Sequence, residues 1–160
     1  MQFVKKGLEQ QETVIVVATD QHRGELNTTL MAEEQIGIWA RNVAEYVTLD
    51  VSATLALFMR NGWPDEQLFL KVIGPIIASA AGSTRVRIYG EMVAVLWAEG
   101  NALAAIHLER LWNKLASRRT FTLLCGYPSS AFQGQDMDFA LEDVCACHSQ
   151  VKGVRSNARV

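Results

Sequence analysis

The chain has 160 residues, a length typical of one domain, and 49% of them are apolar, which excludes an intrinsically disordered chain. Its 15 basic and 17 acidic residues leave a net charge of −2, which disfavours a surface built to bind nucleic acid directly. There is no apolar run near the roughly 18 residues that cross a bilayer, and the three cysteines do not make a disulfide framework. We therefore expect a cytoplasmic protein with no membrane contact.

Four strands are predicted. The first, at residues 14–18, is a continuous Val-Ile-Val-Val-Ala run, which is typical of a strand buried on both faces of a parallel sheet. The other three are predicted at residues 46–49, 85–89 and 121–125.

Helices are predicted between the strands and after the last one. The expected ranges are 21–31, 33–43, 52–59, 64–81, 91–98, 102–117 and 139–149. The expected N-caps are Asp20, Ser52 and Asn101. Gly62 is expected to adopt the left-handed conformation that ends a helix, and Pro64 to open the next one.

This alternation of strands and helices predicts an α/β fold with three αβα layers around a mainly parallel sheet. We expect a single domain over residues 1–151 and a flexible tail over 152–160. Open parallel sheets bind ligands beyond the carboxyl ends of their strands, so a candidate pocket lies where those ends meet.

Two charged residues near the third strand have competing interpretations. Arg87, in the middle of that strand, is either a ligand anchor or partner of Glu91, or a residue of an edge strand that reaches solvent. Glu91, which opens the next helix, either faces a ligand or is a first-turn carboxylate stabilised by the helix dipole.

Aromatic and cysteine residues are better explained by packing than by chemistry. We expect Trp63, Trp97 and Trp112 to lie in the core. The Cys145-Ala-Cys147-His148 run, with Cys125 elsewhere, offers zinc ligands, but it falls inside one helical pattern, where positions 145 and 148 share a face and 147 does not. A hydrogen-bonded histidine and small buried thiols are the favoured interpretation, so no metal is predicted.

Catalytic motifs are absent from the sequence. There is no P-loop, no Gly-x-Gly-x-x-Gly dinucleotide fingerprint, no Gly-x-Ser-x-Gly and no His-Glu-x-x-His. We therefore expect no catalytic residues, no cofactor and no enzyme activity.

Several segments together resemble a known family. They are, in order, RIYGEMVAVLW at 87–97, EGN at 99–101, LERLWN at 108–113, FTLLCGYP at 121–128 and VCACHS at 144–149. Residues 16–19 with His22, and 58–62 with the Pro-Asp pair at 64–65, also fit. The chain is thereby similar to the MEDS domain, the sensory domain named for methanogens, methylotrophs and the regulator of dichloromethane dehalogenase.

The resemblance implies a sensory domain that binds a small molecule, with hydrocarbon derivatives as proposed ligands, and that signals to a histidine kinase or a transcriptional regulator. It also implies a RecA-like fold without a nucleotide motif. The positions that we expect to contact ligand are Glu91, Arg87, Tyr127, His22, Trp112, Asn113 and His148.

Members of the family usually begin with a further strand and helix, so this chain resembles a member whose first strand is missing. An exposed sheet edge favours association, and we expect a homo-oligomer. Two other functions stay open at this point: a degenerate RecA-like nucleotide-binding scaffold without hydrolysis, and an enzyme that uses Glu91 or Cys125.

Overall fold

The computed structural model describes residues 1–32, 45–82, 84–127 and 138–150, with only the backbone at 138–141. Strands β1 (Thr13–Ala18), β2 (Tyr46–Asp50), β5 (Val86–Gly90) and β6 (Thr122–Cys125) form a parallel sheet in the order β2-β1-β5-β6. All four predicted strands are confirmed, with shifts of one residue at most at their ends. The expectation that the family's first strand is missing from this chain is not tested by this sheet and stays an expectation.

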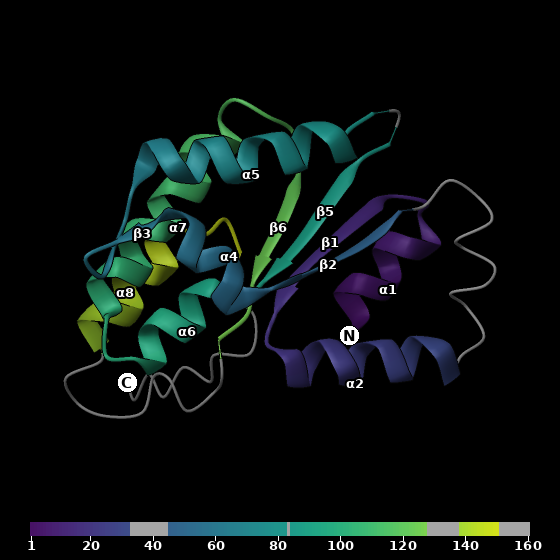
Figure 1. Ribbon diagram of the computed structural model, residues 1–160, viewed down its shortest axis with the longest axis horizontal. Coiled ribbons are helices and arrows are strands. Elements are labelled where there is room, and N and C mark those ends of the chain that lie inside the picture. Colours follow the sequence, from purple (N-terminus) through teal and green to yellow (C-terminus); the bar gives the residue numbers. More distant parts are fainter. Residues whose placement is uncertain (33–44, 83, 128–137, 151–160) are drawn as a thin grey trace, which may run out of the picture.

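Helices cover both faces of the sheet (Figure 1). On one face lie α1 (Gln2–Glu9) and α2 (Asp20–Ala32), whose Leu8, Leu26 and Leu30 belong to one apolar cluster. On the other lie α4 (Val51–Phe58), α5 (Glu66–Ala80), α6 (Met92–Ala98), α7 (Ala102–Ala116) and α8 (Asp138–Ala146), which contribute to a larger cluster. The expected three-layer αβα fold is confirmed.

The position of strand β1 between two layers of helices explains why its sequence is apolar throughout. Val14, Val16 and Ala18 pack toward α1 and α2, whereas Ile15 and Val17 pack into the larger cluster on the opposite face. All six residues of the strand are buried. Because β1 also pairs with β2 on one side and β5 on the other, it lies at the centre of the layers.

Two of the predicted helix caps are one or two residues away from the true ones. Thr19, not Asp20, accepts a hydrogen bond from the backbone N–H of His22 through its Oγ1 (3.3 Å), and Asp20 is already helical. Asp50, not Ser52, caps α4 by accepting from the N–H of Ala53 (2.8 Å). In both cases the helix begins within two residues of the end of the preceding strand, so a polar residue at that strand end is the cap.

The segment between α4 and α5 is a small hairpin rather than a direct helix–helix junction. Strands β3 (Met59–Arg60) and β4 (Trp63–Pro64) pair across Asn61 and Gly62, both of which have positive φ (52° and 75°). The left-handed Gly62 is confirmed, but Pro64 belongs to β4, and Asp65 caps α5 by accepting from the N–H of Leu68. Trp63 is therefore exposed, stacked on His107, and its assignment to the core was wrong.

Other predictions have mixed outcomes. Asn101 caps α7 as expected, accepting from the N–H of Ala104. Helix α8 ends at Ala146, so Cys147 and His148 follow it in a turn and do not continue it as predicted. The helix expected over 33–43 and the tail over 152–160 lie outside the described residues. Within the described part of the chain, no helix is long and apolar enough to span a membrane.

Arg87 is buried at the centre of the sheet, because β5 has neighbours on both sides, so the edge-strand interpretation is wrong. Its Nε donates to Glu12 Oε2 (2.5 Å), its Nη2 donates to Gln10 Oε1 (3.2 Å), and its guanidinium lies over the ring of Phe3. Glu12 is buried as well. This ion pair joins the end of α1 to the sheet, on the face opposite the larger cluster.

Replacing Arg87 with methionine is expected to lower the free energy of unfolding by about 3–5 kcal/mol, because it leaves the carboxylate of Glu12 buried and unpaired. Urea denaturation measures this loss. The matched control is Arg85→Met, at an exposed residue two positions earlier, with an expected change within about 0.5 kcal/mol. Equal effects of the two substitutions would contradict the assignment.

Candidate functional site

The carboxyl ends of β1 and β5 form a topological switch point. The two strands are neighbours in the sheet, yet α2 leaves β1 toward one face and α6 leaves β5 toward the other. The two connections therefore separate and leave a crevice beyond the strand ends, which is where open parallel sheets bind ligands. The predicted residues Glu91 and His22 both lie there.

Glu91 is the centre of this crevice. The residue follows β5 directly and is 5% exposed. Oε2 accepts from the backbone N–H of Thr19 (3.0 Å), and Oε1 is 2.7 Å from His22 Nδ1 and accepts from the hydroxyl of Tyr89 (2.8 Å). The carboxylate thus ties the end of β5 to the loop after β1 and the first turn of α2.

This arrangement places a carboxylate where a helix favours an anion. The first N–H groups of α2 have no partner within the helix, and the helix dipole makes that end positive. In phosphate-binding folds such a helix end holds the phosphate. Here the side chain of Glu91 already accepts from Thr19, at the entrance to α2.

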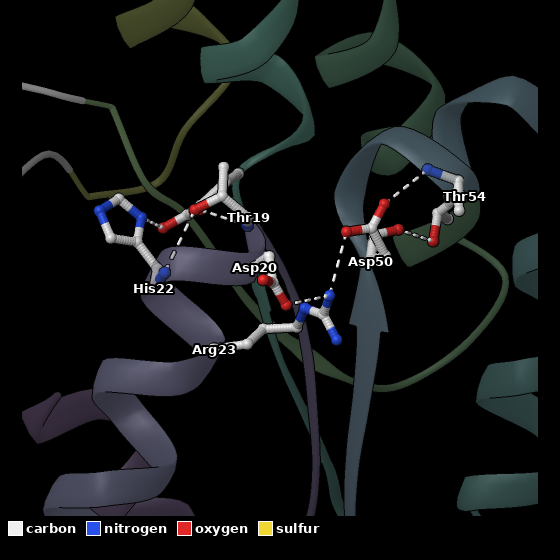
Figure 2. A network of polar contacts seen from close by, with 8 residues as sticks. Thr19, Asp20, His22, Arg23, Asp50 and Thr54 are labelled. Atoms are coloured by element: carbon white, nitrogen blue, oxygen red, sulfur yellow. Dashed lines mark hydrogen bonds and ion pairs between the residues drawn. The ribbon is translucent and has the colours of Figure 1, made fainter.

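A second polar network lies beside the first, at the end of β2 (Figure 2). Arg23, one turn into α2, reaches across to Asp50 (3.0 Å) and also contacts Asp20 (3.2 Å). The backbone N–H of Ala53 and the charge of Arg23 lower the pKa of Asp50. Figure 2 also shows His22 and Arg23 leaving the same first turn of α2 in different directions, so this turn contributes to both networks.

Two cavities of similar size flank Glu91. One, of about 300 Å³, lies between α1, α2 and the sheet, and the other, of about 290 Å³, lies against α6 and the end of β6. His22, Tyr89 and Glu91 line both. The remaining walls are largely apolar: Met1, Phe3, Val4, Val16, Ala18, Leu26 and Leu124 in the first, and Ala94, Val95, Ala98 and Tyr127 in the second.

A separate polar cluster surrounds Glu109, which is 2% exposed on the inner face of α7. Its Oε2 lies 3.2 Å from Cys125 Sγ, and its Oε1 accepts from the hydroxyl of Tyr127 (3.1 Å) and lies 3.3 Å from His148 Nε2. Hydrogen bonding to Glu109 raises the pKa of His148, although partial burial opposes the shift. Burial, with the charge of Glu109, also raises the pKa of the Cys125 thiol well above its usual value.

The residues that sequence reasoning grouped together therefore lie in three places. Glu91 and His22 meet at the switch point, Tyr127 and His148 meet at Glu109, and Arg87 pairs with Glu12. Two further residues lie near the second group: Trp112 is in the core, and Asn113 donates to the backbone oxygen of Cys147 (2.8 Å).

Sequence reasoning places Thr19 and Tyr89 among the strand ends that build the candidate pocket, but it does not predict their contacts with Glu91, and it missed Glu109. The two contacts with Glu91 were hidden because they depend on the pairing of β1 with β5. Glu109 carried a signal: it lies four residues after Ala105 and three before Trp112, on the apolar stripe of a predicted helix. A carboxylate on that stripe has to find buried partners.

The fold and this site together define an α/β domain with a candidate binding crevice at the switch point of a parallel sheet. The family model described as "MEDS: MEthanogen/methylotroph, DcmR Sensory domain" matches residues 1–149. The chain belongs to this family of sensory domains. Comparison with the curated proteins found no match, and neither did comparison with the solved structures.

Gly126, at the mouth of the second cavity, keeps the space that the Tyr89 hydroxyl occupies. A Cβ added there would lie 2.6 Å from Tyr89 Oη. Gly126→Ala is expected to push the ring away from Glu91 and to cost about 1–3 kcal/mol of stability. Chemical denaturation measures the cost, and Gly90→Ala, where a Cβ meets nothing within 4 Å, is the control. A Gly126→Ala protein as stable as that control would contradict the packing described.

The raised pKa values of the three tyrosines predict that these side chains ionise only at strongly alkaline pH. Burial raises the pKa of Tyr46 to about 12, and burial together with a neighbouring carboxylate raises the pKa of Tyr89 and Tyr127 further. Ultraviolet titration of the native protein should show no tyrosinate at pH 10, where the unfolded chain is half ionised. Because the folded pKa values are the higher ones, this contribution to stability is complete below about pH 10 and falls as pH rises above it. Tyrosinate formed near pH 10 while the far-ultraviolet circular dichroism stays native would contradict it.

Proposed function

We propose that this domain is a non-catalytic sensor that binds a small, mainly apolar molecule with one hydrogen-bond donor beside Glu91. The observation that carries the proposal is the carboxylate of Glu91, placed between two cavities with largely apolar walls at the switch point. Membership of a sensory-domain family supports the same role. The cavities suit a hydrocarbon derivative such as a short alcohol or amine.

A ligand could replace one of the hydrogen-bond partners of the Glu91 carboxylate. Oε1 is shared by the Tyr89 hydroxyl and His22, and the side chain of His22 is 54% exposed. A ligand donor that takes the place of His22 on Oε1 would let the ligand's apolar part enter the cavity. The donor replaces the contact that His22 gives up, because each hydrogen-bond partner that a buried carboxylate loses is costly, even with Thr19 and Tyr89 still donating.

The same contacts provide a route for the signal. Thr19 and His22 lie at the start of α2, so a ligand that displaces His22 alters how α2 is held against the sheet. We propose that a partner reads this change. A histidine kinase or a transcriptional regulator of the cytoplasm fits the family, and self-association of this domain is part of the same proposal.

The alternative functions receive less support. A nucleotide phosphate at the start of α2 would meet the carboxylate of Glu91, and like charges repel. A nucleophilic Cys125 needs a thiolate, but its raised pKa keeps the thiol protonated.

A thermal-shift screen of the purified chain tests the proposal with short alcohols, amines, halogenated hydrocarbons and nucleotides. A ligand at about 100 times its Kd should add about 2.7 kcal/mol of stability. Glu91→Gln should abolish the shift, and the control Glu99→Gln, at an exposed residue at the end of α6, should keep it. Stabilisation by nucleotides and not by hydrocarbon derivatives would overturn the proposal.

A further inference from the structure

Three potential metal ligands converge at Glu109, and none of the three lines the cavities beside Glu91. Glu109 comes from the inner face of α7, Cys125 from the end of β6 and His148 from the turn after α8. One ligand atom from each lies within 4.8 Å of the other two. These elements are distant in sequence, so the cluster is made by the tertiary fold.

We propose that Glu109, Cys125 and His148 bind one Zn²⁺ ion, with water in the fourth position. Carboxylate oxygen, thiolate sulfur and imidazole nitrogen are the donors that zinc takes in proteins, and sites with three protein ligands leave one position open. This proposal is independent of the ligand proposed for Glu91.

The two contacts that Glu109 makes with the other donors have lengths near the ligand spacing around a tetrahedral ion. With bonds of about 2.0–2.3 Å, neighbouring ligand atoms of a tetrahedral zinc lie roughly 3.3–3.6 Å apart. His148 Nε2 lies 3.3 Å from Glu109 Oε1, and Cys125 Sγ lies 3.2 Å from Oε2. The contact with His148 is longer than the roughly 2.7–2.9 Å of a charge-assisted hydrogen bond. The two contacts involve different oxygens of Glu109, so an ion held by one of these oxygens requires a small rotation of the carboxylate and a closer approach of Cys125 and His148.

The orientation of His148 supports the same assignment. Its Nδ1 lies 2.7 Å from the backbone oxygen of Val144, and a carbonyl can only accept, so Nδ1 carries the proton. Nε2 is the nitrogen that faces Glu109. Histidine ligands of metals are typically held in this way, with the other ring nitrogen donating to a backbone carbonyl or a carboxylate.

The charges of the cluster balance with a dication. The carboxylate of Glu109 and the thiolate of Cys125 carry two negative charges, and His148 binds as the neutral ring. On binding, the thiol proton and any proton on Nε2 leave to water, and the buried site becomes neutral. Neutrality matters here because Glu109 is almost completely shielded from solvent.

The ion would connect the turn after α8 to α7 and to the end of β6. Asn113 already holds the same turn by donating to the oxygen of Cys147. Tyr127, which donates to Glu109, also lines the second cavity, so the zinc site and the ligand crevice share one wall.

Titration of the metal-free full chain with Co²⁺ and Zn²⁺ tests the proposal. We expect one ion per chain, a sulfur-to-cobalt charge-transfer absorption, displacement of Co²⁺ by Zn²⁺, and a higher melting temperature with zinc. Cys125→Ser keeps a hydrogen-bond donor for Glu109 but removes the thiolate, so this variant should fold, lose the charge-transfer band and bind zinc more than about tenfold more weakly.

His148→Gln, at a partly exposed side chain, is the second variant and should also weaken zinc binding at least about tenfold. The matched controls are Cys145→Ser and His107→Gln, which lie outside the cluster and should bind as the parent does. If the parent takes up no ion, or if Cys125→Ser retains the charge-transfer band, the cluster is only a set of hydrogen bonds to Glu109 and the proposal is overturned.

Discussion

The need to compensate buried carboxylates organises this domain. Within the described residues, Glu12, Glu91 and Glu109 are each at least 95% shielded from solvent. A carboxylate in such a place is stable only with hydrogen-bond donors or an opposite charge around it. Each carboxylate has partners from segments that are far away in the sequence. Each therefore also connects separate helices and strands through specific polar contacts.

The three carboxylates differ in whether a ligand or a metal ion could bind beside them. Glu12 is neutralised by Arg87 in a buried pair, so it joins α1 to the sheet and offers nothing to a ligand. Glu91 has donors that include an exposed histidine and lies between two cavities, so its partners can be exchanged. Two of the contacts of Glu109, Cys125 and His148, are of residue types that can bind a metal ion. All three carboxylates are buried, so the residue types and the exposure of their partners are what distinguish a structural ion pair from a candidate binding site.

Two tyrosines bring the candidate sites together. Tyr89 donates to Glu91 and Tyr127 donates to Glu109, and both rings line the second cavity. Tyr127 also packs edge-on against Trp97, which holds its ring. Gly126 precedes Tyr127 and gives Tyr89 its space, because a methyl group there would collide with the hydroxyl. The crevice is thus shaped by the end of β6 as much as by the ends of β1 and β5.

The sequence by itself determined the strands and the layers. A run such as Val14 to Ala18 is typical of a strand covered on both faces, and the alternation of elements leaves few topologies. It also pointed to Glu91 and His148, through family motifs. Only the tertiary structure decided the partners. Arg87 meets Glu12 and not Glu91, and the side chain of His148 meets Glu109, because strand order and helix packing set which distant side chains share a buried space. Local periodicity carries no information about those pairings.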